Sequence, residues 1–355
     1  MQSSAGPGEC CKPTRPITSR RSAFMSSDVM LSNRRAAWLV CAALVFTAWV
    51  NPARAQTGEG GPVKIVVGFP PGGSLDTIAR LLGEKLQTHL KRPVLVENRP
   101  GAGGRLAVDT FKNAPADGSV VMIAPDTISV SAPIVFKKLT YDPARDFVPV
   151  STLVQFPFAL AVGEDPKAAV FADYVRWAKA NPARASFGSP APGSPPHFFG
   201  LVVGRAIGVD MVHVPFQGTA PIVTNLAGGQ VSAGISTVGD LMEHHRGGRI
   251  RIVAVSAAKR IPQLPDVPTF TELGYPEVVG QGFIGLYVPP KASPAVIQQW
   301  NQSIRGVLAL PDVQERLRNL GLEPTPSTPQ ELSQLTSAEI GKWQPIIRAS
   351  GFSLD

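Results

Sequence analysis

The amino-acid sequence predicts an α/β fold with two lobes and a helical tail. Apolar runs of strand length alternate with apolar positions at helical spacing, the alternation resumes near residue 159, and the C-terminal part is purely helical. Of the 355 residues, 44% are hydrophobic and 17% charged, which predicts a sizeable core and excludes a disordered chain. The 34 glycines and 35 prolines indicate many loops between compact elements.

The first lobe is predicted to begin with a strand, a Pro-Pro-Gly-Gly turn and a helix. The expected strands are 63–69, 94–97 and 120–124, and the expected helices are 75–90 and a segment ending near Asn113. Because strands and helices alternate in this order, we expect a parallel, doubly wound sheet.

The second lobe repeats the alternation, and the tail returns to the first lobe. The expected strands are 159–162, a strand opening at 186–187, 209–216, 231–235, 250–256 and 283–288, and the expected helices are 171–180, 195–207, 220–227 and 238–245. Ser293-Pro294 and Thr328-Pro329-Gln330-Glu331 are helix-start signals in the tail. We therefore expect lobe I to comprise 62–160 plus 288–355 and lobe II 161–287, with a ligand cleft at the strand ends.

The N-terminal region is typical of a secretory signal peptide. Arg34-Arg35 precede the apolar run 36–50, and Ala53-Arg54-Ala55 forms an A-x-A site, which predicts cleavage after Ala55. An N-terminal membrane anchor is the alternative, but the apolar run is short for a membrane span. All three cysteines lie in residues 1–55, so the mature chain is expected to be a soluble periplasmic protein without disulfides.

The charge distribution argues against nucleic acid as a partner. The formal net charge is +8, but residues 1–55 hold seven of the 34 basic residues and only two of the 26 acidic ones. The mature body is therefore close to neutral and carries no strong electrostatic footprint for nucleic acid.

Three junctions between a strand and a helix are candidate ligand sites. At the first, Gly72 and Gly73 allow close approach of a ligand, Ser74 is expected to cap the helix, and Asp76 lies in its first turn. Free N–H groups at such a helix start attract an anion, and Asp76 can also accept a hydrogen bond from a ligand. The alternative interpretation is a plain glycine-rich turn before a well-capped helix.

The second junction, 188–194, and the third, 215–219, repeat the combination of glycines and hydroxyl groups. Ser194 is expected to cap the helix that starts with Pro195. Because none of the three loops contains lysine or arginine, N–H groups and hydroxyls would hold a ligand, which suits a reversibly bound small carboxylate.

Catalytic and cofactor motifs are missing from the sequence, and we expect neither a cofactor nor a metal. Residues 101–106 lack the last glycine of G-x-G-x-x-G, and residues 234–238 lack that of G-x-S-x-G. His244-His245 is the only histidine cluster, and neighbours on a helix face different ways. A triad of Asp76, Ser194 and His197 is conceivable, but its spacing is nonspecific.

Several sequence blocks in a characteristic order carry a resemblance to a known family. They are VVGFPPGGSLDTIARLLGEKL (66–86), VLVENRPGAGG (94–104), ADGSVVMIAP (116–125), LTYDPARDFVPV (139–150), AKANPARASFGSPAPGS (178–194), VHVPFQGTAP (212–221), GGQVSAGIS (228–236) and LPDVPTFTELGYP (264–276). Together they resemble the Bug family, the TctC-like periplasmic solute receptors of tripartite tricarboxylate transporters.

The resemblance implies a two-lobe, type II Venus-flytrap fold, with no catalysis, that binds a small carboxylate and delivers it to membrane permease subunits. It also implies that ligand-binding residues lie in the three loops, and that 97–99 support the fold. Carried over onto this sequence, the ligand-binding residues are Phe69, Gly72, Gly73, Ser74, Asp76, Ser189, Gly193, Ser194, Pro215, Phe216 and Gly218.

Some positions depart from the family pattern. Phe216-Gln217 stand where the family commonly has Tyr-Lys, and Ser236 stands where it has an aspartate that would pair with an amine or repel a second carboxylate. The distal group of the ligand is therefore left open. A receptor that presents its loaded form to a membrane kinase and a periplasmic hydrolase are the alternative functions, and a monomer is expected.

Overall fold

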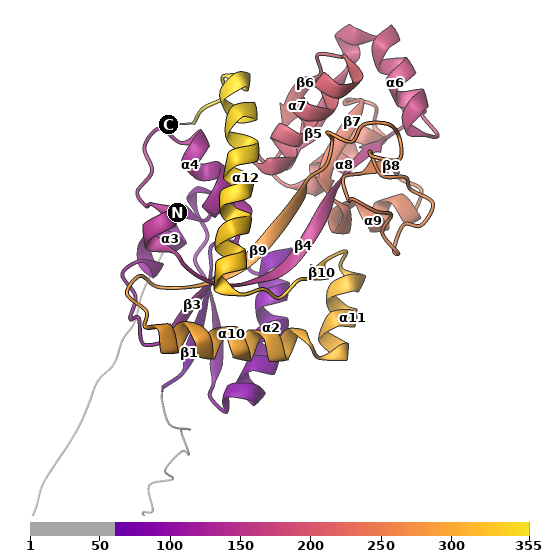
Figure 1. The fold of residues 1–355 in the computed structure, drawn as a ribbon. Helices are drawn as coiled ribbons and strands as arrows, with labels where there is room; N and C mark the ends of the chain where they lie inside the picture. The colour runs from indigo at the N-terminus through magenta and orange to yellow at the C-terminus, as the bar shows by residue number, and fades with distance from the viewer. Residues whose placement is uncertain (1–60, 355) are drawn as a thin grey trace, which may run out of the picture. The chain divides into compact units, whose positions relative to one another are not determined.

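The computed structural model describes residues 61–354, which belong to one compact unit (Figure 1). The expected signal peptide, its cleavage site after Ala55 and all three cysteines lie outside the described residues. Within the described part of the chain, no helix is both long enough and apolar enough to span a membrane.

A mixed sheet with the order β2-β1-β3-β9-β4 forms the first lobe. Its strands are β1 (Val63–Val67), β2 (Val94–Asn98), β3 (Val120–Pro125), β9 (Gln281–Val288) and β4 (Val148–Val162), with β10 (Glu323–Pro324) paired to β4. β1 is parallel to β2 and β3, whereas β9 is antiparallel to β3 and β4. Alternate β1 residues Val63, Ile65 and Val67 are fully buried, and β1 packs against helices α2 (Ser74–Leu90) and α3 (Arg105–Phe111).

The second lobe is built on a second sheet with the order β4-β7-β5-β6, in which β8 also pairs with β4. Its further strands are β5 (Ser186–Ser189), β6 (Val212–Pro215), β7 (Ala233–Thr237) and β8 (Arg251–Val255). β5 is parallel to β6 and β7, and β4 is antiparallel to β7 and β8. The predicted α/β fold with two lobes is confirmed, and the antiparallel β4 and β9 are the exceptions to its parallel character.

Two long strands join the lobes, and the sequence pattern revealed only part of them. β4 pairs with β9 from Val148 to Pro157 and with β7 and β8 from Phe158 onward, so one strand serves both sheets. Figure 1 shows β4 and β9 running side by side between the lobes. The lobe boundaries expected from the sequence, at 160/161 and 287/288, fall on these two strands and remain a proposal.

Helices cover the strands in both lobes. Those of the first lobe are α2 (Ser74–Leu90), the 3₁₀ turn η1 (Ala102–Gly104), α3 (Arg105–Phe111), the π turn η2 (Thr127–Ser131), α4 (Ala132–Val135) and α5 (Pro143–Asp146). Those of the second lobe are α6 (Phe171–Ala180), η3 (Pro182–Arg184), α7 (Pro195–Ile207), α8 (Thr219–Ala227) and α9 (Val238–Arg246). The tail comprises α10 (Pro294–Leu308), α11 (Pro311–Asn319) and α12 (Pro329–Ser350).

One large hydrophobic cluster runs through both lobes, and a smaller one lies beneath α8 and α9. Aromatic side chains fill the second lobe: Phe171 and Phe270 meet edge to face at 5.2 Å, and Phe158 and Phe199 pack at 5.6 Å between ring centroids. The larger cluster is therefore continuous from one lobe to the other, while the smaller one belongs to the second lobe alone.

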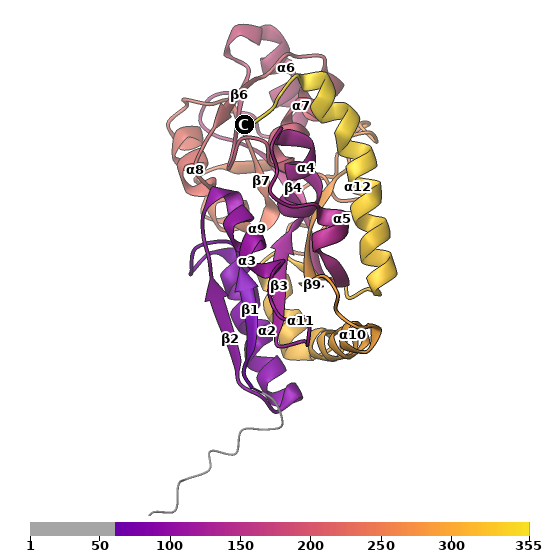
Figure 2. The same ribbon diagram turned by 90° about the vertical axis from the view of Figure 1, so that its left-hand side faces the viewer.

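The helical tail starts where the sequence predicts and ends against both lobes. Ser293 accepts a hydrogen bond from Val296 N, and Thr328 forms the capping box that begins α12. α12, the long yellow helix in Figure 2, contacts η2 and α4 of the first lobe and α7 of the second. Beyond it, Leu354 exchanges backbone hydrogen bonds with Val135 and Lys137, which attaches the chain end to the first lobe.

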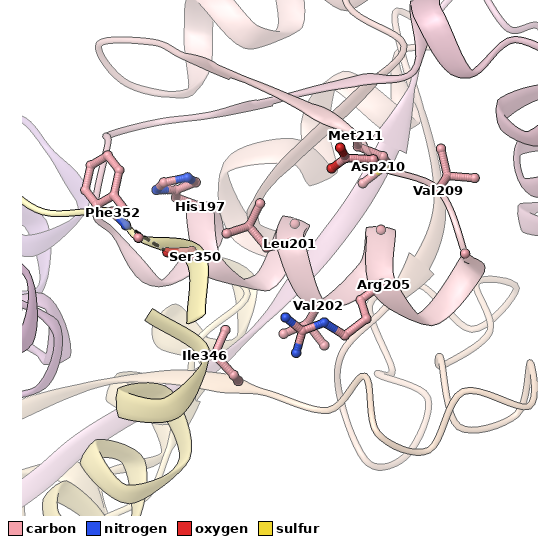
Figure 3. Close-up of a pocket in the computed structure, with 14 residues that line it drawn as sticks. His197, Leu201, Val202, Arg205, Val209, Asp210, Met211, Ile346, Ser350 and Phe352 are labelled. Carbon is pink, nitrogen blue, oxygen red and sulfur yellow. Dashed lines mark hydrogen bonds between the residues drawn. The ribbon is translucent and has the colours of Figure 1, made fainter. Parts of the chain in front are cut away.

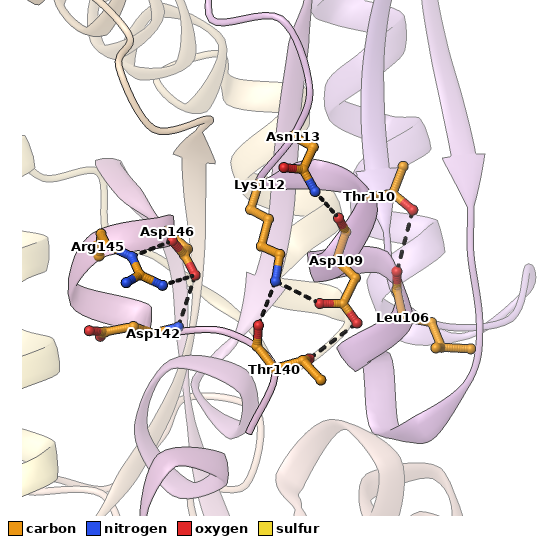
Figure 4. A network of polar contacts seen from close by, with 9 residues as sticks. All are labelled: Leu106, Asp109, Thr110, Lys112, Asn113, Thr140, Asp142, Arg145 and Asp146. Carbon is orange, nitrogen blue, oxygen red and sulfur yellow. Dashed lines mark hydrogen bonds and ion pairs between the residues drawn. The ribbon is translucent and has the colours of Figure 1, made fainter. Parts of the chain in front are cut away.

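A polar network holds the segment between α4 and β4 (Figure 4). Lys112 pairs with Asp109 at 3.0 Å and donates to the carbonyl of Thr140, whose hydroxyl donates to Asp109. Asp146 is buried and accepts hydrogen bonds from Arg145 and from the N–H group of Asp142. These contacts explain the acidic and basic residues of the 139–150 block as parts of the scaffold.

Candidate functional site

The first junction is an exposed glycine-rich loop between β1 and α2. Gly68 lies against Gly104, and a Cβ atom on Gly68 would stand 2.8 Å from Gly104 Cα, so no side chain fits there. Gly72 has a φ of +85°, which a glycine adopts without strain. The N-cap of α2 is Gly73, so the expectation that Ser74 caps the helix is wrong, and no side chain caps its first turn.

Asp76 holds this loop in its conformation through hydrogen bonds. Its carboxylate is 3% exposed and accepts hydrogen bonds from Gly72 N, Arg80 Nε and Asn98 Nδ2 at 2.9, 2.8 and 2.9 Å. The pKa of Asp76 is lowered to about 2, mainly by the hydrogen bond from Arg80, with those from Gly72 and Asn98 contributing and burial acting in the opposite direction. Both oxygens are thus engaged within the protein, which makes Asp76 a positioning residue for the loop.

Asn98 completes this support. Its side-chain amide donates to Phe69 O at 3.1 Å as well as to Asp76, so the end of β2 holds both ends of the loop. Glu97 and Arg99 form an ion pair beside it. The supporting role expected for residues 97–99 agrees with these contacts.

The second junction, after β5, is largely buried. Ser189 Oγ lies 2.8 Å from His213 Nε2, and Ser194 Oγ donates to Ala191 O at 2.7 Å. Ser194 is the N-cap residue of α7, but its hydroxyl does not bond to the first-turn N–H groups, so the expected hydroxyl cap is absent. Gly193 has a φ of +74° and donates its N–H to His197 Nδ1 at 3.2 Å.

Two stacked histidines lie beneath this loop. The rings of His197 and His213 have centroids 3.7 Å apart at 18°. Burial lowers the pKa of each to about 4, and for His197 the neighbouring ring adds to this effect, so both rings are neutral near pH 7. Phe352, in the chain end beyond α12, packs edge to face on His197 at 4.8 Å.

The third junction, between β6 and α8, is bonded to the second. Phe216 N donates to Ser189 O at 3.0 Å, and Gly218 N donates to Pro190 O at 2.8 Å. Gly218, with a φ of +94°, is the N-cap of α8 and supplies no side-chain cap, while Pro215 precedes it on the exposed end of β6. The second and third loops therefore form one surface at the strand ends of the second lobe.

A fourth junction, which the sequence interpretation did not include, links the first and third. β7 leads into α9, where Asp240 accepts a hydrogen bond from Thr219 Oγ1 at 3.1 Å and one from Ser74 Oγ at 3.4 Å. Thr219 Oγ1 also lies 2.7 Å from Ser236 Oγ. The sequence signal for this junction is Thr237-x-x-Asp240, a helix start directly after a strand, as at the other three junctions.

A cavity of about 320 Å³ lies where these elements meet. Of the eleven predicted site residues, Gly72 and Ser74 line it, and the facing wall carries Thr237, Gly239 and Asp240. The 189–194 loop instead contacts the first lobe at Gly193, where a Cβ atom would stand 3.0 Å from Val135 and 3.1 Å from Phe352. The first predicted loop thus lies at the 320 Å³ cavity, and the second meets the first lobe at a separate place, beside Val135 and Phe352.

A larger cavity, about 690 Å³, lies between α7 and the end of α12 (Figure 3). His197, Arg205, Met211 and Phe352 are among its lining residues, and none of the eleven predicted residues lines it. Among the described residues, no group of three histidines, cysteines or acidic residues could hold a metal ion.

The comparisons with known proteins agree with this architecture. A family model described as the tripartite tricarboxylate transporter family receptor matches residues 78–352. The protein BugT of Bordetella pertussis is 33% identical over 312 residues, which cover 85% of this chain and 93% of BugT.

Two solved structures are similar in both sequence and fold. The R. palustris protein Rpa4515, determined with adipate, is 29% identical with a TM-score of 0.76, and the match covers 83% of this chain and 99% of that one. MatC from Rhodopseudomonas palustris, with bound malate, is 29% identical with a TM-score of 0.71 and a coverage of 81% and 99%.

The fold is therefore that of the two-lobe periplasmic binding proteins, to which the similar BugD structure also belongs. The family model covers more than half of the chain and includes both lobes. This chain belongs to the tripartite tricarboxylate transporter family of receptors, whose members bind solutes and are not enzymes.

Proposed function

We propose that this chain is a periplasmic receptor that captures a small organic carboxylate between its lobes and delivers it to the permease subunits of a tripartite tricarboxylate-type transporter. The observation that carries the ligand class is the pair of helix starts at Gly73 and Gly218. Neither has a side-chain cap, so first-turn N–H groups of α2 and α8 are available to an anion. The start of α7 is different, because Pro195 and Pro196 have no N–H group and His197 N donates to Ser194 O.

The eleven residues predicted from the sequence are proposed as the ligand-binding loops, with different roles. Gly72, Gly73 and Ser74 present the start of α2, whereas Asp76 holds their loop in place. Ser189, Gly193 and Ser194 shape the second loop, and Pro215, Phe216 and Gly218 the third. Phe69, half-buried and held through its carbonyl by Asn98, begins the first loop.

The carboxylate class is supported by the relatives, since Rpa4515 was determined with adipate and MatC with malate. Export by the proposed N-terminal signal peptide would place the chain in the periplasm, where such receptors act. Ligand binding would stabilise a closed arrangement of the lobes that the permease recognises. We propose a monomer, with no nucleic-acid partner.

A hydrolase function finds no support in the geometry. The hydroxyl of Ser194 donates to Ala191 O, and His197 Nδ1 accepts from Gly193 N, so these groups are engaged with the backbone of their own loop. Asp76 is bonded to Arg80, Asn98 and Gly72 and serves neither of them. Ligand recovered chemically unchanged after binding is therefore the expected result.

The test is a thermal-shift screen of the chain purified from the periplasm, after ligand removal by unfolding and refolding. Monocarboxylates, dicarboxylates, tricarboxylates and amino acids are compared with the corresponding uncharged amides. A ligand at about 100 times its Kd adds roughly 2.7 kcal/mol to the free energy of unfolding. Stabilisation by an acid and not by its amide supports the proposal, and stabilisation by the amides alone contradicts it.

A further inference from the structure

Asp240, in the wall of the 320 Å³ cavity, is an acid without a cationic partner. Within residues 61–354, no lysine or arginine lies within ion-pair distance of it, and its side-chain partners are the hydroxyls of Ser74 and Thr219. Glu243, the other acid that lines the 320 Å³ cavity, is paired with Arg246 at 2.7 Å. The cavity wall therefore carries one exposed, uncompensated carboxylate and no basic side chain.

Asp240 also determines which way the nearby hydroxyl protons point. A carboxylate only accepts hydrogen bonds, so Ser74 and Thr219 each donate their single proton to Asp240. Thr219 Oγ1 then has no proton left for Ser236, so Ser236 must donate to Thr219 across the 2.7 Å contact. The protons of all three hydroxyl groups are then in use. Their oxygens and the carboxylate of Asp240 can therefore only accept further hydrogen bonds.

This cluster is suited to a group that donates hydrogen bonds and carries positive charge. An ammonium group has three donors and no acceptor, which matches a carboxylate surrounded by accepting hydroxyl oxygens. A second carboxylate placed here would meet the charge of Asp240 and find no donor among these side chains. The uncapped starts of α2 and α8 lie beside the same cluster, because Ser74 and Thr219 are the first residues of those helices.

We propose that Asp240 determines the ligand class of this receptor: a small carboxylate that also carries an ammonium group, with the ammonium at Asp240 and the carboxylate at the uncapped helix starts. The inference rests on the proposed function, since it assumes that the site between the lobes binds a carboxylate. At position 236 the family pattern has an aspartate that would select the distal group of the ligand, and this chain has a serine there. We assign that selection to Asp240. The cavity of about 320 Å³ is of the size that small ligands occupy.

The test compares ω-amino acids with dicarboxylates of matched length, such as 6-aminohexanoate with adipate, by calorimetry on the ligand-free full chain. The wild-type protein is expected to bind one of the amino acids more tightly than its dicarboxylate partner. Asp240→Asn should weaken amino-acid binding by about 10- to 100-fold, as expected for loss of one charge-assisted hydrogen bond. Binding of the dicarboxylate should stay constant or improve.

Asp266→Asn is the matched control, because Asp266 is an exposed aspartate of the second lobe outside the cavity. It should leave both affinities unchanged. Asp240→Ser provides a second variant in case the asparagine lowers stability, and the unfolding midpoint of each ligand-free variant is measured alongside.

The outcomes separate the two proposals. Wild-type preference for a dicarboxylate, or a preference for the amino acid that Asp240→Asn leaves intact, overturns the role of Asp240 while the carboxylate receptor stands. If no carboxylate of either series binds the wild-type chain, both proposals fail.

Discussion

Replacing Asp76 with alanine tests whether one buried carboxylate holds the first loop in its binding conformation. The change leaves three donors without their acceptor: Gly72 N, Asn98 Nδ2 and Arg80 Nε. The Arg80 side chain is 55% exposed and returns to water, so its share is small. The two other donors are part-buried and cost about 1–2 kcal/mol each when unpaired. We expect the free energy of unfolding to fall by about 2–4 kcal/mol, measured by urea unfolding of the ligand-free protein.

Binding should fall more than stability alone explains. Without Asp76, nothing fixes Gly72 N, and Asn98 loses one of its two contacts with the loop, so we expect carboxylate affinity to drop at least about tenfold. Asp146→Ala is the control, since Asp146 is also buried and accepts from Arg145 and Asp142 N away from the site. It should cost about 1–2 kcal/mol, because Asp142 N is the one part-buried donor left unpaired, and it should leave the Kd unchanged. Equal Kd values for Asp76→Ala and the wild type, by calorimetry, would refute the positioning role.

Three further predictions concern the second loop and the chain end. Because burial lowers the pKa of His197 and His213 to about 4, the unfolded chain binds protons first below about pH 6.5, so stability should decline between pH 6.5 and 4. Unfolding at stepped pH checks this, and a His213→Gln variant should show a shallower decline; an equally steep one would contradict it. Gly193→Val should destabilise by about 1–3 kcal/mol in thermal unfolding, because φ is +74° and Val135 stands 3.0 Å from a Cβ. Phe352→Ala should lower stability by about 2–4 kcal/mol and expose His197 to modification, and unchanged reactivity of that ring would argue against the packing.

Much of the fold could be predicted because local signals are strong in this chain. β1 and β3 are short apolar runs bounded by turn residues, and the capping residues Ser293 and Thr328 mark the helices of the tail. These signals depend on residues close in sequence, so a single chain is sufficient to read them.

The elements that were missed depend on distant partners. The part of β4 that pairs with β9, Val148 to Pro157, contains two prolines together with polar residues, and its extended conformation comes from this pairing with a strand more than 120 residues later in the chain. The short helix α11 is mostly polar, with Val313 and Leu317 as its buried residues. Tertiary contacts therefore override a weak local pattern in both cases.

The candidate site, like the fold, was predictable only where its features depend on residues close in sequence. Glycines and hydroxyl groups at strand ends were sufficient to predict the loops. N-cap preferences favoured Ser74 as the cap of α2, whereas the N-cap residue in the structure is Gly73. Asp240 was not singled out, because an acid in the first turn of a helix is expected for the helix dipole alone. Its contact with Ser74 joins residues 166 positions apart, which no local pattern reveals.

The strand shared by the two sheets sets the mechanical character of the joint. β4 and β9 remain hydrogen-bonded to each other from Val148–Val288 to Pro157–Gln281, with register shifts near Ser151 and Val154. A paired ribbon of this kind can twist and flex elastically, whereas a wide swing would break ladder hydrogen bonds. The joint is therefore stiff, and the radius of gyration measured by small-angle scattering should differ only slightly between the empty and loaded protein. The closed arrangement proposed for the loaded form would then be reached by a small twist of this ribbon, and a permease would detect the altered surface where the lobes meet rather than a large change in outline.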